Sequence, residues 1–330
     1  MVSLIAPIYS NKIHKYFWNS ILEQRSETFE LIILTNSISE DLTNTIKEIE
    51  KKSNIKLQVI FTTRKIGFNE VVINGSKTSK GTHAIVLNVS EQLSRNFVNE
   101  LTEIVNKNID VDIIEFKASF RGFENWTPQK RCKLKQNHVF EIIDFPKVIP
   151  FTFPFISNKI FKVSLANDVS KKSSYIETSS HLSLEFLYML FLYAETYLYV
   201  DKVLCNIIIE KGDVPNYLSF YKEWKSIKSK YVLENKFIQE IEYAQIFHIE
   251  MIVPLLYTHK RLVDIIIRSR GVDKTLSAKI FEKNKKLRLQ DFASFNYTNK
   301  YMLLNLSETE YLNKSHPPNK WPKIIKILKE

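Results

Sequence analysis

The sequence predicts an α/β protein with a doubly wound, mostly parallel sheet, followed by a helical C-terminal region. Three observations lead to this class. First, short apolar runs of strand length alternate with helical patterns through the first part of the chain. Second, each run stops abruptly at polar residues. Third, beyond Gly212 the composition shifts, and only helical patterns follow as far as about Lys286. Regular alternation of this kind favours parallel strands with right-handed connections.

The first four strands are expected at Val2–Ile8, Phe29–Leu34, Ile55–Phe61 and Thr82–Leu87. Three helices are expected between them, at Lys12–Glu23, Leu42–Lys51 and Asn69–Lys80. Pro7 must lie at the end of the first strand, because proline cannot donate a hydrogen bond to a sheet ladder. Ser39 or Asp41 is a plausible N-cap of the second helix. Gly81 is expected to be the C-cap of the third.

The later elements follow the same reasoning. A helix at Ser94–Asn106, a strand at Val111–Phe116, a helical segment at Asn158–Leu165, an apolar helix at Leu182–Tyr197 and a strand at Tyr199–Ile209 are expected, then helices at Tyr217–Lys230, Glu234–Thr258 and Leu262–Arg270. We therefore expect a first domain over residues 1–212 and a mainly helical region over residues 213–330.

The composition is that of a globular protein, with 44% hydrophobic and 25% charged residues in a chain of 330. With 6 glycines, and neither G-x-G-x-x-G nor G-x-x-x-x-G-K, a glycine-rich phosphate loop is excluded. The two cysteines, Cys132 and Cys205, have no metal-ligand spacing, so neither a disulfide framework nor a zinc site is expected.

The net charge of +11 points to phosphate-rich partners or to a lysine-rich solvated surface. Nucleic acid is not expected as a partner, because the sequence has neither an RNP-like aromatic motif nor a helix-turn-helix signature. Met1 leads directly into an apolar strand without a signal-peptide pattern, and no apolar run reaches bilayer length. The expected location is cytoplasmic.

The helical C-terminal region carries a broad apolar surface at Ile246–Leu256. Core packing or a homodimer interface would explain this surface. Peripheral attachment to the inner face of an anionic plasma membrane is the other interpretation, and it would use the basic side chains of Lys260, Arg261, Arg268 and Arg270.

Polar residues collect where the predicted strands end. They are Tyr9, Thr35, Asn36, Asn88 and Glu91. In an open α/β sheet, ligands bind beyond the carboxyl ends of the strands, so these residues mark the expected ligand site.

The order of these segments resembles the family-2 glycosyltransferases of the GT-A fold. Val2–Ser10 (VSLIAPIYS) resembles that family's first strand, and Phe29–Ser37 (FELIILTNS) its second. Asn74–Glu91 resembles the segment leading to the D-x-D motif, and Ser157–Phe161 (SNKIF) resembles the family's W-N-K-L-F element. The resemblance covers nearly the whole chain.

The resemblance implies a nucleotide-sugar site, with a UDP-sugar as the expected donor. Matching the motifs residue by residue gives six candidates for nucleotide binding: Pro7, Tyr9, Thr35, Asn36, Asn88 and Lys159. Lysine could stabilise the departing diphosphate electrostatically. Glu91 and Ser90 are the candidate ligands for Mg²⁺ or Mn²⁺, which prefer oxygen donors. The other interpretation is that Asn88 and Ser90 only cap a turn.

The general base implied by the resemblance falls near the start of the predicted apolar helix. Glu185 and His181 share a helix face there, and Glu177 is a third candidate. A helix cap or a hydrogen-bonded histidine would explain the same residues.

The acidic motifs of the family are replaced here. Its first Asp pair is Thr35-Asn36, its D-x-D is Asn88-Val89-Ser90, and its E-D pair falls near Leu182–Leu184. Two functions are therefore expected. One is an inverting glycosyltransferase acting on a cell-surface glycan, glycolipid or glycoprotein in cell-envelope polysaccharide biosynthesis. The other is a catalytically inactive relative that acts as partner or scaffold of an active glycosyltransferase.

Overall fold

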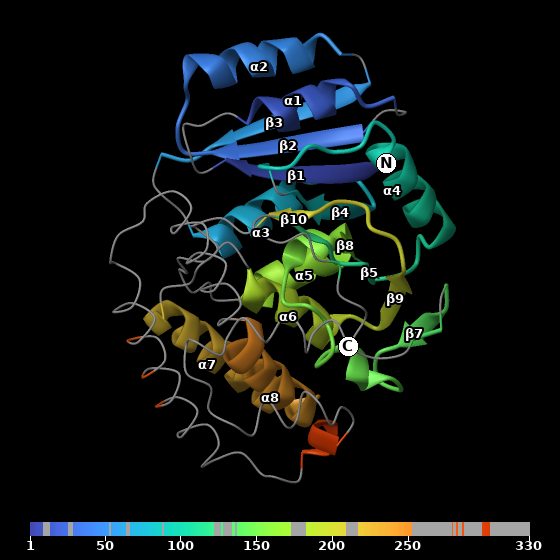
Figure 1. Cartoon of the computed structure of the whole chain (residues 1–330), viewed down its shortest axis with the longest axis vertical. Coiled ribbons are helices and arrows are strands. Elements are labelled where there is room, and N and C mark those ends of the chain that lie inside the picture. The colour runs from blue at the N-terminus through green and yellow to red at the C-terminus, as the bar shows by residue number, and fades with distance from the viewer. Residues whose placement is uncertain are drawn as a thin grey trace.

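The computed structural model describes residues 1–8, 14–25, 29–52, 54–63, 67–87, 89–121, 127, 134–135, 137–172, 183–208, 217–252, 279, 282, 286 and 299–303. Its centre is an eight-stranded sheet with the strand order β3-β2-β1-β4-β8-β5-β9-β7 (Figure 1). The pairs β3-β2, β2-β1, β1-β4 and β5-β9 are parallel, whereas β8 runs antiparallel to both of its neighbours and β7 antiparallel to β9. The predicted mostly parallel α/β sheet is confirmed.

The strands of this sheet are β1 (Val2–Ile8), β2 (Phe29–Thr35), β3 (Ile55–Phe61), β4 (His83–Val86), β5 (Ile113–Phe116), β7 (Val139–Glu141), β8 (Lys159–Lys162) and β9 (Thr196–Val200). A separate parallel pair is formed by β6 (Phe120–Arg121) and β10 (Ile207–Ile208). The helices are α1 (Lys15–Leu22), α2 (Glu40–Glu50), α3 (Phe68–Thr78), α4 (Phe97–Lys107), α5 (Val163–Lys172), α6 (Leu184–Tyr193), α7 (Tyr217–Leu233) and α8 (Ile238–Phe247). Short turns of 3-10 helix are η1 (Pro146–Val148), η2 (Ile156–Asn158) and η5 (Lys300–Leu303), and η4 (His248–Ile252) is a π-helix.

Side chains alternate between the two faces of the sheet, as the pleat of a strand requires. Along β1, Leu4 and Ala6 join the apolar cluster with α1, α2 and α4, while Ile5 joins the cluster with α3, α5 and α6. Because helices cover both faces, β1, β2 and β4 are buried along their whole length, whereas the edge strands β3 and β7 are partly exposed. The doubly wound arrangement is therefore confirmed.

The first strands and helices lie close to their predicted positions. β1 and β3 have the predicted bounds, and Ser39 is the N-cap of α2, accepting a 3.2 Å hydrogen bond from the Leu42 amide. Pro7 is the penultimate residue of β1. It pairs in register with Leu34 on one side and lies beyond the last β4 pair, Ile5↔Val86, on the other. β4 ends before the position opposite Pro7, so the sheet needs no hydrogen bond from the amide that proline lacks.

The prediction that Gly81 is a helix C-cap was wrong. α3 ends at Thr78, Ser79 is its C-cap, and the Gly81 amide donates to Ser3 Oγ at 3.0 Å. A Cβ at this position would lie 2.8 Å from the carbonyl oxygen of Met1 and 2.9 Å from the Ser3 amide nitrogen. Glycine is required because the chain approaches β1 too closely for a side chain.

The prediction of a helix over Asn158–Leu165 was wrong in its first half. Lys159–Lys162 forms β8, which inserts antiparallel between β4 and β5, and α5 begins only at Val163. The predicted apolar helix Leu182–Tyr197 is also shorter than expected, because Thr196 and Tyr197 belong to β9.

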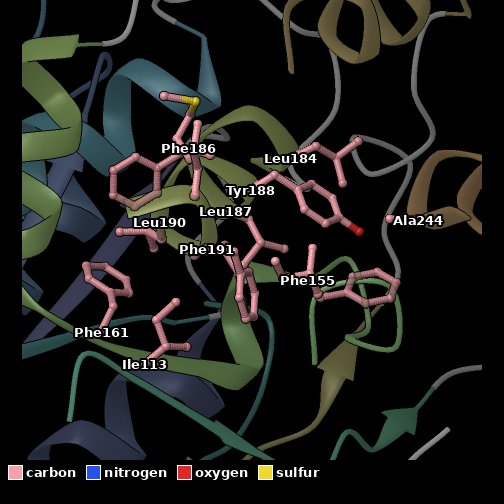
Figure 2. Packing of buried hydrophobic residues seen from close by; sticks show 14 of the residues in the cluster. Ile113, Phe155, Phe161, Leu184, Phe186, Leu187, Tyr188, Leu190, Phe191 and Ala244 are labelled. Atoms are coloured by element: carbon pink, nitrogen blue, oxygen red, sulfur yellow. The ribbon is translucent and has the colours of Figure 1, made fainter. Parts of the chain in front are cut away.

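α6 lies at the centre of the larger apolar cluster. Its residues from Leu184 to Leu192 are all buried. Figure 2 shows its side chains directed toward Ile113 and Phe161 on one side and toward Ala244 of α8 on the other. Trp224, Ile227 and Tyr231 of α7 belong to the same cluster.

α7 and α8 lie at the end of the molecule opposite α2 (Figure 1). α7 packs on α6, and α8 packs on α7. The predicted domain boundary at residue 212 falls outside the described residues and stays a prediction. Most of the predicted Ile246–Leu256 surface lies in α8 and η4, where Ile246, Ile249 and Ile252 are buried in the core. In the described part of the chain, none of the helices has the length and apolar character needed to cross a membrane.

Candidate functional site

The carboxyl edge of the sheet is formed by the ends of β1, β2 and β4. Ile8 pairs in register with Thr35, and Ile5 pairs with Val86. α3 follows β3, and α6 leads into β9, so both helices begin at this same edge. The predicted ligand site is therefore bordered by three strand ends and by the N-termini of α3 and α6, which carry partial positive charge.

Thr35 and Asn36 lie at the end of β2. The Thr35 side chain is buried, and its hydroxyl donates to the Ser37 carbonyl at 2.8 Å and accepts from the Ser37 amide at 3.2 Å. These bonds form a local turn and occupy the hydroxyl. Asn36 is half-buried at the rim of the same edge. Pro7 lies next to this pair, in β1.

Glu91 is buried, and its Oε1 accepts a 2.5 Å hydrogen bond from the backbone amide of Asn206. This bond ties the segment after β4 to the segment between β9 and β10. Ser90 is half-buried beside it. Burial raises the pKa of the neighbouring Cys205 thiol, and the Glu91 charge adds to that rise.

The described residues do not fit a metal site at this point. Within the ranges that the structure covers, no three His, Cys, Asp or Glu side chains are grouped so that they could hold an ion. The Glu91 carboxylate already holds a backbone amide, and a divalent cation generally needs several oxygen ligands.

Lys159 lies in β8, level with the end of β4, but its side chain is fully buried. Its ammonium group donates to the Phe153 carbonyl oxygen and, at 2.6 Å, to Asn158 Oδ1, and it lies 3.8 Å from Glu115 Oε1. The other carboxylate oxygen of Glu115 accepts from Thr152 at 2.9 Å and from Tyr197 at 2.7 Å. This position argues against direct contact between Lys159 and a diphosphate.

Glu185 lies in the first turn of α6 and is 1% exposed. Its Oε1 accepts a 2.7 Å hydrogen bond from Ser226 Oγ of α7, and its backbone amide donates at 2.9 Å to Glu223 Oε1, also of α7. Ser183, the N-cap residue, makes no capping bond of its own. The first amides of a helix have no acceptor within the helix, and Glu223 supplies one to the Glu185 amide.

A ring of polar side chains surrounds this helix start. Ser183 Oγ donates to Asn69 Oδ1 at 2.7 Å, and Asn69 Nδ2 donates to Glu223 Oε1 at 3.1 Å. Glu223 in turn accepts from the Glu185 amide, which closes the ring through the backbone of α6. Ser183 has the left-handed values φ 52° and ψ 46°, a conformation that costs a non-glycine residue roughly 1–3 kcal/mol.

The Glu223 carboxyl group is electrostatically unusual. Its side chain has no exposed surface, and Oε2 has no hydrogen-bond partner. Burial raises the pKa of Glu223 to about 7, and the Glu185 charge adds to the rise, whereas the hydrogen bonds from the Glu185 amide and Asn69 oppose it. The group can therefore gain or lose a proton near neutral pH.

No functional role was predicted for Asn69, Glu223 or Ser226. A signal for Glu223 was present, because it lies on one helix face with Ile227 and Tyr231 at intervals of one turn, and an acid in an apolar stripe needs a partner. Three predicted site residues, Tyr9, Asn88 and His181, lie outside the described residues, as does Glu177.

Solved structures resemble this chain over nearly its whole length. The crystal structure of S. aureus TarS 1-349 has a TM-score of 0.60 and 13% identity, covering 98% of this chain and 90% of that one. The same TarS fragment in complex with UDP-GlcNAc has a TM-score of 0.59, with equal identity and coverage. The mannosyltransferase PcManGT from Pyrobaculum calidifontis, in complex with GDP-Man and Mn²⁺, has a TM-score of 0.51 and 11% identity, covering 99% of this chain and 84% of that one.

No protein-family model and no curated protein matches the sequence. The similarity is therefore one of structure, at identities too low to carry residue roles across. The fold is that of the GT-A-like glycosyltransferases, as the sequence motifs predicted.

Proposed function

We propose that this protein is a glycosyltransferase that uses a nucleotide-sugar donor, with a UDP-sugar as the first candidate. One observation carries the proposal: 98% of the chain superposes on a TarS structure that contains UDP-GlcNAc. UDP alone is bound in another structure of the same fragment, and GDP-Man in the mannosyltransferase. The order of strands and the placement of helix N-termini at the carboxyl edge agree with a nucleotide site there.

In this proposal the nucleotide lies against Pro7, Tyr9, Thr35, Asn36 and Asn88. Because the Thr35 hydroxyl is held by Ser37, its contribution is to fix the turn that presents Asn36. Lys159 is left out, since its ammonium group is enclosed with Glu115. No metal-dependent step is included, because the described side chains do not fit a metal site.

Transfer would proceed with inversion in a single displacement. The acceptor hydroxyl gives its proton to a carboxylate, for which Glu185 is the candidate, with His181 as the other group predicted nearby. The acceptor oxygen then bonds to the anomeric carbon, while the bond from that carbon to the diphosphate breaks and its electron pair leaves with UDP. Since Glu185 is buried in this conformation, the N-terminus of α6 must rearrange before an acceptor can reach it.

Isothermal titration with UDP, UDP-GlcNAc and GDP-Man, each with and without Mn²⁺, tests this proposal. We expect binding of at least one of them, weakened several-fold in Asn36→Ala. Asn99→Ala is the matched control, because Asn99 is exposed on α4, on the other face of the sheet. Absence of binding to every nucleotide would contradict the proposal, whereas a strict need for Mn²⁺ would contradict only its metal-free form.

A second candidate function is that of an inactive partner or scaffold of another glycosyltransferase. It is favoured by the bonding of Glu91 to Asn206, of Lys159 to Glu115 and of Glu185 to Ser226. Nucleotide binding without any nucleotide release from a donor, together with stoichiometric recovery of a second transferase from the native host, would support this candidate over the first.

The acceptor is proposed to be a cell-surface glycan, glycolipid or glycoprotein precursor. Cytoplasmic location, peripheral contact with the plasma membrane and a homodimer remain predictions from the sequence. Sedimentation of the protein with anionic vesicles, compared with neutral vesicles, tests the membrane contact.

A further inference from the structure

Two side chains of α7, one helical turn apart, contact the same residue of α6. Glu223 accepts from the backbone amide of Glu185 at 2.9 Å, and Ser226 donates to the Glu185 carboxylate at 2.7 Å. The backbone amide and the carboxylate of Glu185 are therefore both held by α7, a helix of the C-terminal region. The rest of α7 is anchored by Trp224, Ile227 and Tyr231 in the apolar cluster around α6.

These contacts are joined to the sheet through α3. Asn69, in the first turn of α3, donates to Glu223 at 3.1 Å and accepts from Ser183 at 2.7 Å. The strained Ser183 backbone is held between this bond and the capped helix start. Backbone strain of this kind persists only where the surroundings determine it, and it concentrates at functional sites.

The ring of Asn69, Ser183, Glu185 and Glu223 lies at the carboxyl edge of the sheet, where both α3 and α6 begin. Glu223 is fully buried and makes all of its described hydrogen bonds through Oε1, so it has no surface from which to touch a substrate in this conformation. Its position suits it to hold another residue in place.

We propose that Glu223 and Ser226 of α7 are positioning residues for Glu185, so that α7 is part of the active site of this glycosyltransferase. This inference rests on the proposed function, because it assigns Glu185 a role in sugar transfer. The groups that contact Glu223 are Asn69 from α3 and the backbone amides of Leu184 and Glu185 from α6, and the Glu185 carboxylate lies close enough to act on its charge. Of these, Glu185 is the ionisable one.

The experiment measures nucleotide release from UDP-GlcNAc and GDP-Man by the full chain, and nucleotide affinity in parallel. Loss of a positioning contact lowers the rate of transfer without changing nucleotide binding. We expect Glu223→Ala and Ser226→Ala to lower kcat by about tenfold or more, since misplacement of about 1 Å can cost about 100-fold. The Kd for UDP should stay at the wild-type value.

Glu223→Gln separates positioning from proton transfer. Glutamine keeps an oxygen that can accept from the Glu185 amide and from Asn69, but it cannot ionise. We expect it to retain most of the wild-type kcat and to lose any step in the pH–rate profile near pH 7. Ser229→Ala and Glu234→Gln are matched controls on exposed positions of α7 and its C-terminal end, and both should behave as the wild type.

Each outcome decides the inference. A wild-type kcat in Glu223→Ala or Ser226→Ala would overturn it and leave the proposed function intact. Equal loss of activity in Glu223→Gln and Glu223→Ala would also overturn it, because Glu223 would then be needed as an acid or base. If Glu223→Ala does not fold, Glu223→Gln and Ser226→Ala give the answer. A wild-type chain that releases no nucleotide from either donor would refute the proposed function, and the inference with it.

Discussion

The Nζ atom of Lys159 lies 3.8 Å from Oε1 of Glu115 in the interior of the protein, and neither side chain is more than 1% exposed. Thr152 and Tyr197 also donate to Glu115, and Lys159 reaches the Phe153 carbonyl oxygen and Asn158. The pair therefore connects β5, β8 and β9 to the aromatic segment between η1 and η2. A buried pair of this kind is costly to break because the remaining charge stays unpaired.

Lys159→Met should lower the free energy of unfolding by about 3–5 kcal/mol, because it leaves Glu115 charged and buried. The double variant Lys159→Met with Glu115→Gln should recover much of that loss. Urea unfolding of the wild type and both variants, followed by circular dichroism, measures the difference.

The matched control for this prediction is Lys202→Met. Lys202 lies 3.1 Å from Glu100 on the surface, with 51% of its side chain exposed, so its replacement should change stability by less than about 1 kcal/mol. A Lys159→Met protein as stable as the Lys202→Met protein would show that the buried pair is not needed for the fold.

Glu223 makes stability depend on pH. Its pKa is raised from 4.5 to about 7 by burial, so in the window from pH 4.5 to 7 the unfolded chain loses this proton while the folded chain keeps it. Stability therefore falls as pH rises through this window, by an amount on the order of 3 kcal/mol at pH 8. Glu223→Gln should unfold at higher urea concentration than the wild type at pH 8, and near the wild-type value at pH 4.5.

The comparison between these two proteins cancels the contributions of other titrating groups, including the buried histidines. A constant difference in the urea midpoint from pH 4.5 to pH 8 would contradict the prediction. It would mean that Glu223 has the same pKa in the folded and unfolded chains.

His248 has the opposite effect. It is buried, it accepts a 3.0 Å hydrogen bond from Trp224 Nε1 on Nδ1, and burial lowers its pKa from 6.5 to about 3. Below pH 6.5 the unfolded chain takes up a proton that the folded chain refuses, so stability is lost as pH falls from 6.5 toward 3. The loss should be on the order of 2 kcal/mol at pH 5.

His248→Asn should reduce this loss, because the asparagine oxygen can accept from Trp224 and does not titrate. Thermal unfolding of the wild type and of His248→Asn between pH 7 and pH 5 measures this loss of stability. The control is His138→Asn, because His138 is exposed. If His138→Asn flattens the acid profile as much as His248→Asn, the assignment to His248 is wrong.

Gly81→Ala should destabilise the protein by about 1–3 kcal/mol, because the added methyl group meets the backbone of Met1 and Ser3 at less than 3.0 Å. The methyl group would also lie 2.6 Å from Ser3 Oγ, but because the other two contacts are with backbone atoms, adding Ser3→Ala should not restore stability. Calorimetry of the single and double variants tests this, and full recovery in the double variant would mean that the Ser3 hydroxyl alone causes the clash.

The first half of the sheet was predictable because its strands are mainly apolar segments of strand length that end at polar residues. Ile55–Phe61 and the Ser39 cap followed directly from local patterns. β8 could not be found in this way. Its four residues, Lys159–Lys162, are two apolar residues flanked by lysines, and their neighbours in the sheet come from β4 and β5, far away in sequence.

The candidate site was predictable only in its location. The carboxyl edge and Glu185 followed from strand order and from the family resemblance. The partners of Glu185 did not, because Asn69 and Glu223 are 154 residues apart and meet only in the folded chain. Likewise, nothing local distinguishes Lys159, which is buried with Glu115, from the exposed lysines.

The long sequence separation around Glu223 has a consequence for synthesis on the ribosome. All eight strands of the main sheet end by Val200, whereas α7 begins at Tyr217. A growing chain can therefore assemble its sheet before Glu223 and Ser226 leave the exit tunnel. During that interval the start of α6 lacks its cap, so the site is completed as one of the last events of folding.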